Sequence, residues 1–97
     1  MLTTVSGASD YDQAVGHVTL ADVLAARERV GSQLRRTPTF TSRTLGPGVH
    51  LKAELFQPTG SFKVRGVLNK LATLSAPERE RGVIGISAGN HAQALAW

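Results

Sequence analysis

One stretch organises this chain: Pro58-Thr59-Gly60-Ser61-Phe62-Lys63-Val64-Arg65-Gly66. Its proline and glycine predict a tight turn over residues 57–60, and serine, as at Ser61, is a common N-cap residue at the start of a helix. Apolar residues then recur at the three- and four-residue spacing of one helix face. They are Val64, Val67, Leu68, Leu71 and Ala72. We therefore expect a helix that follows Ser61, runs to about Leu74 and buries one face.

Extended segments flank this helix in the sequence. Residues 37–42 mix β-branched, aromatic and polar side chains, and residues 49–56 alternate apolar with polar ones, which is typical of a half-buried strand. After the helix, Val83-Ile84-Gly85-Ile86 is short, apolar and rich in β-branched residues, which predicts a strand buried on both faces. The turn Ser87-Ala88-Gly89-Asn90 follows, and a further helix is expected from His91.

The remaining segments complete an α/β pattern. Thr19 is expected to cap a helix over residues 20–34, because an acidic residue lies three positions later in the first turn. A short helical turn is expected from Ser75, with a proline near its start, and Gly82 should end it. Residues 1–18 show no periodicity and are expected to form a mobile tail. Helices that alternate with strands predict an α/β protein.

Composition narrows the class of protein. The chain has 97 residues, enough for one small domain at most, and is 41% hydrophobic and 19% charged. The net charge of +4 suggests a nucleic-acid partner, but the basic residues are scattered and aromatic residues are few, so no such partner is expected. Without cysteine there are no disulfides and no thiolate metal ligands. The sequence shows no signal peptide and no apolar run of membrane-spanning length, so we expect a cytoplasmic protein with no membrane partner.

Lys63 is a candidate for chemistry. A lysine in the first turn of a helix is mildly misplaced, because the helix dipole is positive there. A function would explain the position, since a lysine amine that loses its proton attacks a carbonyl carbon and forms a Schiff base. The alternative is an ordinary exposed lysine, which is the more common situation.

The turn at residues 87–90 is a candidate anion site. In open α/β sheets, ligands bind beyond the carboxyl ends of the strands, and a helix N-terminus offers unpaired N–H groups to an anion. Gly89 would let a ligand approach the backbone, and Ser87, Asn90 and His91 would add side-chain donors. The alternative is a tight turn in which Ser87 and Asn90 only cap the helix.

Together, the two motifs resemble those of the fold-type-II pyridoxal-phosphate (PLP) enzymes, in the threonine/serine dehydratase branch. The motifs are the stretch quoted first and Ser87-Ala88-Gly89-Asn90-His91-Ala92-Gln93, and the resemblance extends over nearly everything after the tail. It implies an incomplete α/β architecture with a parallel sheet, like that of the tryptophan synthase β subunit. Residues 19–76 would then be the N-terminal part of the large PLP domain, and residues 77–97 the start of the smaller domain.

The resemblance also implies roles for individual residues. Lys63 would form the Schiff base with pyridoxal 5′-phosphate and move protons at the substrate α-carbon, with Phe62 close to the cofactor ring. Asn90 would donate a hydrogen bond to the 3′-oxygen of PLP. The implied substrate-binding residues are Ser87, Gly89, Asn90 and His91. The implied reaction is elimination of the β-hydroxyl of a small amino acid, L-threonine or L-serine, which yields a 2-oxo acid and ammonia.

Two positions refine the expected branch. Relatives that make cysteine or threonine usually carry threonine where this chain has His91, so His91 with Gln93 favours the dehydratase and serine-racemase branch. Racemases of this branch resemble Ser-Ser-Gly-Asn-His and use the second serine as a base. Here that position is Ala88, whose methyl group carries no proton to exchange, so a dehydratase is expected rather than an efficient racemase.

The length of the chain sets a further expectation. The family's Gly-rich phosphate loop and its pyridine-nitrogen ligand are not found within the 97 residues. We therefore expect an N-terminal portion of the enzyme that is poorly folded and inactive alone, with homo-oligomers formed by the whole protein. The alternative is non-catalytic: a truncated product or an anion-binding fragment that retains the motifs.

Overall fold

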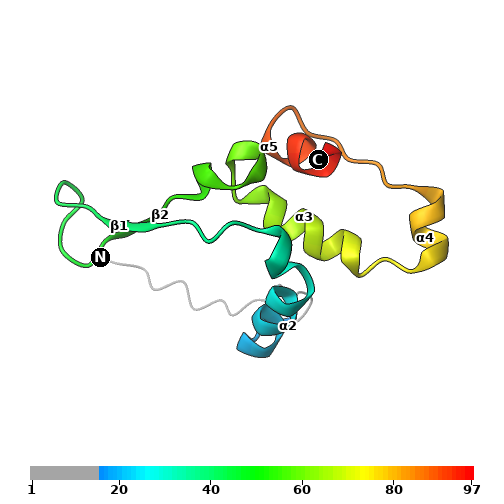
Figure 1. Ribbon diagram of the computed structural model, residues 1–97, viewed down its shortest axis with the longest axis horizontal. Helices are drawn as coiled ribbons and strands as arrows, with labels where there is room; N and C mark the ends of the chain where they lie inside the picture. Colours follow the sequence, from blue (N-terminus) through cyan, green and yellow to red (C-terminus); the bar gives the residue numbers. More distant parts are fainter. Residues whose placement is uncertain (1–15) are drawn as a thin grey trace, which may run out of the picture.

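The computed structural model describes residues 16–97, in which short helices surround one central helix (Figure 1). The expected tail over residues 1–18 lies almost wholly outside the described residues. The elements in chain order are α2 (Leu20–Val30), η1 (Gly31–Gln33), β1 (Thr39–Thr41), β2 (His50–Lys52), η2 (Glu54–Phe56), η3 (Pro58–Gly60), α3 (Lys63–Ala72), α4 (Ala76–Arg81) and α5 (Asn90–Ala96). This is the mixed helix and strand content expected. Within residues 16–97 the only sheet is a small antiparallel pair, so a parallel sheet stays a prediction, as does the domain division after residue 76.

The start of α2 confirms the predicted cap. The Asp22 N–H donates to Thr19 Oγ1 at 3.2 Å, and the Thr19 N–H donates to Asp22 Oδ2 at 2.8 Å, which together form a capping box. The Thr19 hydroxyl also donates to Asp22 Oδ2 at 2.6 Å, and this bond, together with the one from the Thr19 N–H, lowers the pKa of the Asp22 carboxyl. The predicted end was wrong, because the α-helix stops at Val30 and a 3₁₀ turn continues to Gln33. Val30 leaves helical geometry at φ −129° and ψ −3°.

The strands form a short hairpin. β1 and β2 pair antiparallel, with Phe40 opposite Leu51, and the connecting turn has positive φ at Gly46 and Gly48. Extended structure within residues 37–42 is confirmed, but the predicted strand over residues 49–56 was wrong beyond Lys52. From Ala53 the backbone tightens into η2, with the Phe56 N–H donating to the Ala53 carbonyl at 3.2 Å. η2 carries Glu54, whose carboxylate accepts hydrogen bonds from Arg65 of α3.

The core lies where α3 packs against α5, with α2 on another side of α3 (Figure 1). Val64, Val67 and Ala94 are buried, and the partly buried residues around them are Leu34, Leu68, Leu71 and Leu95. The predicted apolar face of α3 is therefore confirmed. The helix is shorter than predicted, since it begins at Lys63 and ends at Ala72. Ser61 is not its N-cap, although Ser61 Oγ accepts a hydrogen bond from the Lys63 N–H at 3.4 Å.

Of the two predictions for residues 75–86, the helix is confirmed and the strand is wrong. α4 begins with a capping box between Ser75 and Glu78 and ends at Gly82, whose φ is +75°, as predicted. Residues 83–86 are not a strand, and they are not buried: Ile84 and Ile86 are each 97% exposed. A strand needs a neighbouring strand to accept its backbone hydrogen bonds, and residues 16–97 supply none at this place.

Helix length and composition bear on membrane insertion. Among residues 16–97, no helix combines the length and the apolar character that crossing a membrane requires.

Candidate functional site

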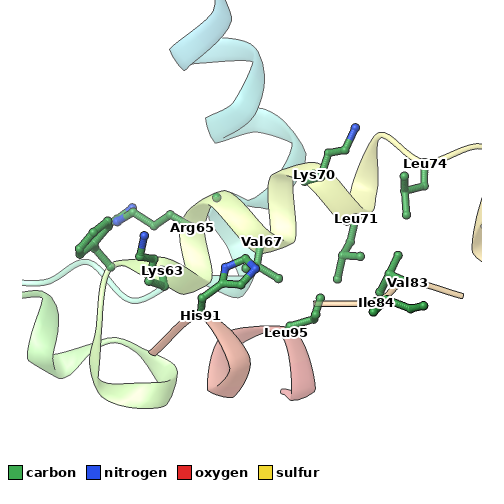
Figure 2. Close-up of a pocket in the computed structure, with 12 residues that line it drawn as sticks. Lys63, Arg65, Val67, Lys70, Leu71, Leu74, Val83, Ile84, His91 and Leu95 are labelled. Carbon is green, nitrogen blue, oxygen red and sulfur yellow. The ribbon is translucent and has the colours of Figure 1, made fainter. Parts of the chain in front are cut away.

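A pocket of about 520 Å³ lies between α3, α5 and the start of the extended segment at residues 83–84 (Figure 2). Most of its wall is apolar, formed by Val67, Leu71, Leu74, Val83, Ile84 and Leu95. The polar groups on its lining are Lys63, Arg65, Lys70 and His91. A volume of this size, mainly apolar with a few polar groups, is typical of small-molecule sites, which span roughly 300–1,000 Å³.

Lys63 is the first residue of α3, and its exposed side chain lines this pocket. Its ammonium nitrogen lies 5.1 Å from the centre of the Phe62 ring, within range of a cation–π interaction. Phe62 lines the same pocket and is 58% exposed. The lysine and the aromatic ring predicted to meet the cofactor are therefore adjacent at one opening.

His91 belongs to the second motif and faces the same pocket. Figure 2 shows its ring reaching from α5 toward α3, and it lines the pocket together with Lys63 and Val67. α5 also packs against η3, the turn that precedes the lysine. The backbone at Gly85 lies close to the Leu95 side chain of α5. A Cβ atom at position 85 would overlap with that side chain. The fold thus brings residues of both motifs to a single cavity.

The other predicted residues of the second motif lie outside the pocket lining. Ser87 Oγ accepts a hydrogen bond from the Gly89 N–H at 3.2 Å, which shapes the turn. Gly89 is the N-cap of α5, and no side chain forms a cap hydrogen bond there. The alternative in which Ser87 and Asn90 cap the helix is therefore not found. Asn90 is exposed, and the roles expected for Ser87, Gly89 and Asn90 stay predictions.

An ion pair beside the lysine was missed in the sequence. The Glu54 carboxylate of η2 accepts two hydrogen bonds from Arg65, from Nε at 2.6 Å and from Nη2 at 2.8 Å. The Thr37 hydroxyl donates a third at 2.6 Å. These partners lower the pKa of Glu54 to about 2, and the carboxylate raises the pKa of Arg65. No periodic signal marks such a pair, since its members come from different elements.

A second polar contact holds the turn before the lysine. Gln57 is 3% exposed, and its amide donates to the Arg35 carbonyl at 2.7 Å and accepts from the Arg35 N–H at 3.0 Å. Two residues later, Thr59 has φ +67°, a left-handed conformation that is unusual for a β-branched residue. Its hydroxyl oxygen is buried without a hydrogen-bond partner among the described residues. The turn is thus held firmly at Gln57 and strained at Thr59.

The family comparison covers most of the chain. A family model described as pyridoxal-phosphate dependent enzyme matches residues 30–97, more than two thirds of the sequence. The matched range includes both motifs and the ion pair. No solved structure matches the chain.

Individual relatives point to several reactions. A putative threonine dehydratase from Sinorhizobium fredii is 45% identical over 87 residues, which cover 86% of this chain and 26% of that protein. An L-threo-3-hydroxyaspartate ammonia-lyase from a Pseudomonas species is 48% identical over 79 residues, 77% of this chain and 25% of the relative. A serine racemase from Dictyostelium discoideum is 39% identical over 84 residues, 82% of this chain and 26% of the relative. The chain spans about a quarter of the length of these relatives.

Proposed function

The chain belongs to the pyridoxal-phosphate dependent enzyme family, and from this premise we propose that it carries the lysine-bearing part of an ammonia-lyase active site. The cofactor is pyridoxal 5′-phosphate. The proposed reaction removes the β-hydroxyl and the amino group of a small amino acid and yields a 2-oxo acid and ammonia. The names of the relatives support this substrate class, because threonine, serine and 3-hydroxyaspartate all carry a hydroxyl on the β-carbon.

The residues present fit this cofactor. Lys63 offers an amine to an aldehyde, and the exposed ring of Phe62 lies beside that amine, where a flat heterocycle would pack. Residues such as Val67 and Leu95 form an apolar wall in the same pocket. When bound, PLP supplies an electron sink for the negative charge that develops at the substrate α-carbon.

The chain's own groups have separate proposed tasks. Lys63 would hold the cofactor through its amine, and the same amine, released when the substrate amino group takes its place, would accept the proton from the substrate α-carbon. His91 donates a hydrogen bond to the substrate carboxylate, and the turn around Ser87 and Asn90 adds further donors. The single observation that carries the proposal is that Lys63 and His91, one from each motif, line one pocket.

Selective labelling tests the proposal. The protein is treated with PLP, reduced with borohydride, and digested to map the modified lysines. We expect the label mainly on Lys63, with little on Lys52 and Lys70, and loss of that label in a Lys63→Arg variant. Equal labelling of the three lysines would contradict the proposal and favour the alternative of a non-catalytic, anion-binding chain.

Elimination is proposed over racemisation because of Ala88. Exchange of a proton on the opposite face of the substrate needs a second acid–base group, and the methyl group of Ala88 offers none. With L-serine, the whole protein should form pyruvate much faster than D-serine. Equal rates would favour the serine racemase named among the relatives. A cytoplasmic location and a homo-oligomer of the whole protein belong to the same proposal.

A further inference from the structure

The first turn of α3 has no acidic residue, unlike the first turns of α2 and α4, which begin with capping boxes. α2 has Asp22 and α4 has Glu78 in the first turn, each part of a capping box. α3 instead begins with Lys63 and Arg65, and no side chain caps its N-cap position. Two cations at the positive end of a helix dipole are unfavourable, so this end of α3 needs an anion from elsewhere in the fold.

Glu54 supplies that anion. It lies outside α3, in η2, and its two carboxylate oxygens meet the Arg65 guanidinium side by side, a geometry that fixes direction as well as distance. The Glu54 side chain is 15% exposed and the Arg65 side chain is 42% exposed, so the carboxylate is the more sheltered partner.

The surrounding contacts make Glu54 a fixed anchor rather than a mobile surface acid. Thr37 donates its hydroxyl hydrogen to Glu54, and the Thr37 carbonyl in turn accepts a hydrogen bond from the Lys52 ammonium at 2.6 Å. The Glu54 carboxylate therefore joins the extended segment at Thr37 to the start of α3, and the end of β2 joins this network through the Thr37 carbonyl. Arg65 is two residues beyond Lys63 and lines the same pocket.

We propose that Glu54 and Arg65 are positioning residues for Lys63: the ion pair fixes the first turn of α3 and so aims the Lys63 amine at the pocket. This role rests on the proposed function, because aiming the Lys63 amine matters for the reaction only if Lys63 holds the cofactor. Neither residue needs to touch the cofactor or the substrate. A break in the pair leaves the helix in place but loosens its first turn, where the reacting amine is attached.

Two readouts on the same helix test this role. The first is amide hydrogen exchange, which needs no cofactor. The Arg65 N–H is bonded to the Phe62 carbonyl at 3.1 Å in the first turn, and the Thr73 N–H to the Lys70 carbonyl at 3.1 Å in the last. The second is the ratio of PLP label, fixed by borohydride, on Lys63 to that on Lys70. Lys70 is the internal reference, because it lies on the same helix and its ammonium points away from α5 (Figure 2). General unfolding of α3 would change the labelling of both lysines, whereas loss of position at the first turn would change that of Lys63.

The variants are Glu54→Gln and Arg65→Lys, with Arg79→Lys as the matched control. Arg79 donates to the Ala72 carbonyl at 3.2 Å and so contacts the opposite end of α3. For the first two variants we expect exchange in the first turn to rise about tenfold, the effect of losing one charge-assisted hydrogen bond. Exchange at Thr73 should stay unchanged, and the Lys63 to Lys70 label ratio should fall by a similar factor. Arg79→Lys should leave both first-turn readouts unchanged.

The outcomes separate this role from the proposed function. Unchanged first-turn exchange in Glu54→Gln and Arg65→Lys would overturn the positioning role, whatever the labelling shows. Equal and parallel increases at the first and last turns would also overturn it, because the pair would then only stabilise the helix. Equal labelling of Lys63 and Lys70 in the unaltered protein would instead refute the proposed function, while the exchange measurement still decides whether the pair orders the first turn.

Discussion

Acidification should destabilise the protein through Glu54 in particular. The pKa of this carboxyl is lowered from its usual 4.5 to about 2 by Arg65 and Thr37, so protonation must break favourable contacts. A shift of this size corresponds to a ceiling of about 3–4 kcal/mol, at about 1.4 kcal/mol for each pKa unit. Because the Arg65 side chain is 42% exposed, water screens the pair, and we expect about 1–2 kcal/mol.

The sign follows from the lowered pKa. The unfolded chain binds the proton more readily than the folded one, so this stability is fully present above about pH 4.5 and is lost as the pH falls toward 2. The assay is urea unfolding at pH 7 and at pH 3 for the unaltered protein and for Glu54→Gln. The variant should lose about 1–2 kcal/mol at pH 7 and show a correspondingly smaller drop on acidification.

Other carboxyls also titrate in this range, so the comparison between the two proteins is what matters. Asp22 and Glu78 have lowered pKa values as well, but both remain in the variant. Their contribution therefore cancels in the difference. An identical acid-induced loss of stability in the two proteins would refute the reasoning, because Glu54 would then not be coupled to folding through its charge.

Three further predictions concern backbone strain and the packing of the core. Thr59→Gly should stabilise the protein by up to about 1 kcal/mol in urea unfolding. Glycine relieves left-handed strain of about 1–2 kcal/mol, and the greater entropy that it gives the unfolded chain offsets part of this gain. A loss of stability would show that the Thr59 side chain matters more than the strain. Val64→Ala should cost about 2–3 kcal/mol because Val64 is fully buried, against less than about 1 kcal/mol for the half-exposed Val83→Ala, and equal losses would contradict the assigned core. Gly85→Ala should cost about 1 kcal/mol through overlap with Leu95, and Leu95→Ala should cost less in that background than alone; strictly additive losses would argue against the contact.

The starts of α2 and α4 were the most predictable features of the fold. A capping box needs only two residues three positions apart, so Thr19 with Asp22 and Ser75 with Glu78 act in the same way whatever surrounds them. The apolar face of α3 was also readable, because helical spacing alone places Val64 and Val67 on one side. Local physics decides these features, and the sequence contains all of it.

The strand predicted over residues 83–86 and the end of the strand predicted over residues 49–56 were wrong for the opposite reason. Residues 83–86 have the composition of a buried strand, but a strand forms only where another strand accepts its hydrogen bonds, and composition does not say whether one is present. In residues 49–56 the alternating pattern continues beyond Lys52, yet the chain turns into η2 there. The turn brings Glu54 to Arg65, and a contact between residues eleven positions apart leaves no mark in the local pattern, where strand preference is weak.

The sequence by itself determined the chemical parts of the candidate site: a lysine at a helix start, an aromatic neighbour, and a glycine-containing turn with His91. These depend on order and spacing along the chain. Only the tertiary structure decided that Lys63 and His91 line one pocket and that Glu54 balances the cations at the start of α3. Both outcomes depend on how α5 and η2 pack against α3, and packing follows from the shapes and charges of surfaces that lie far apart in the chain.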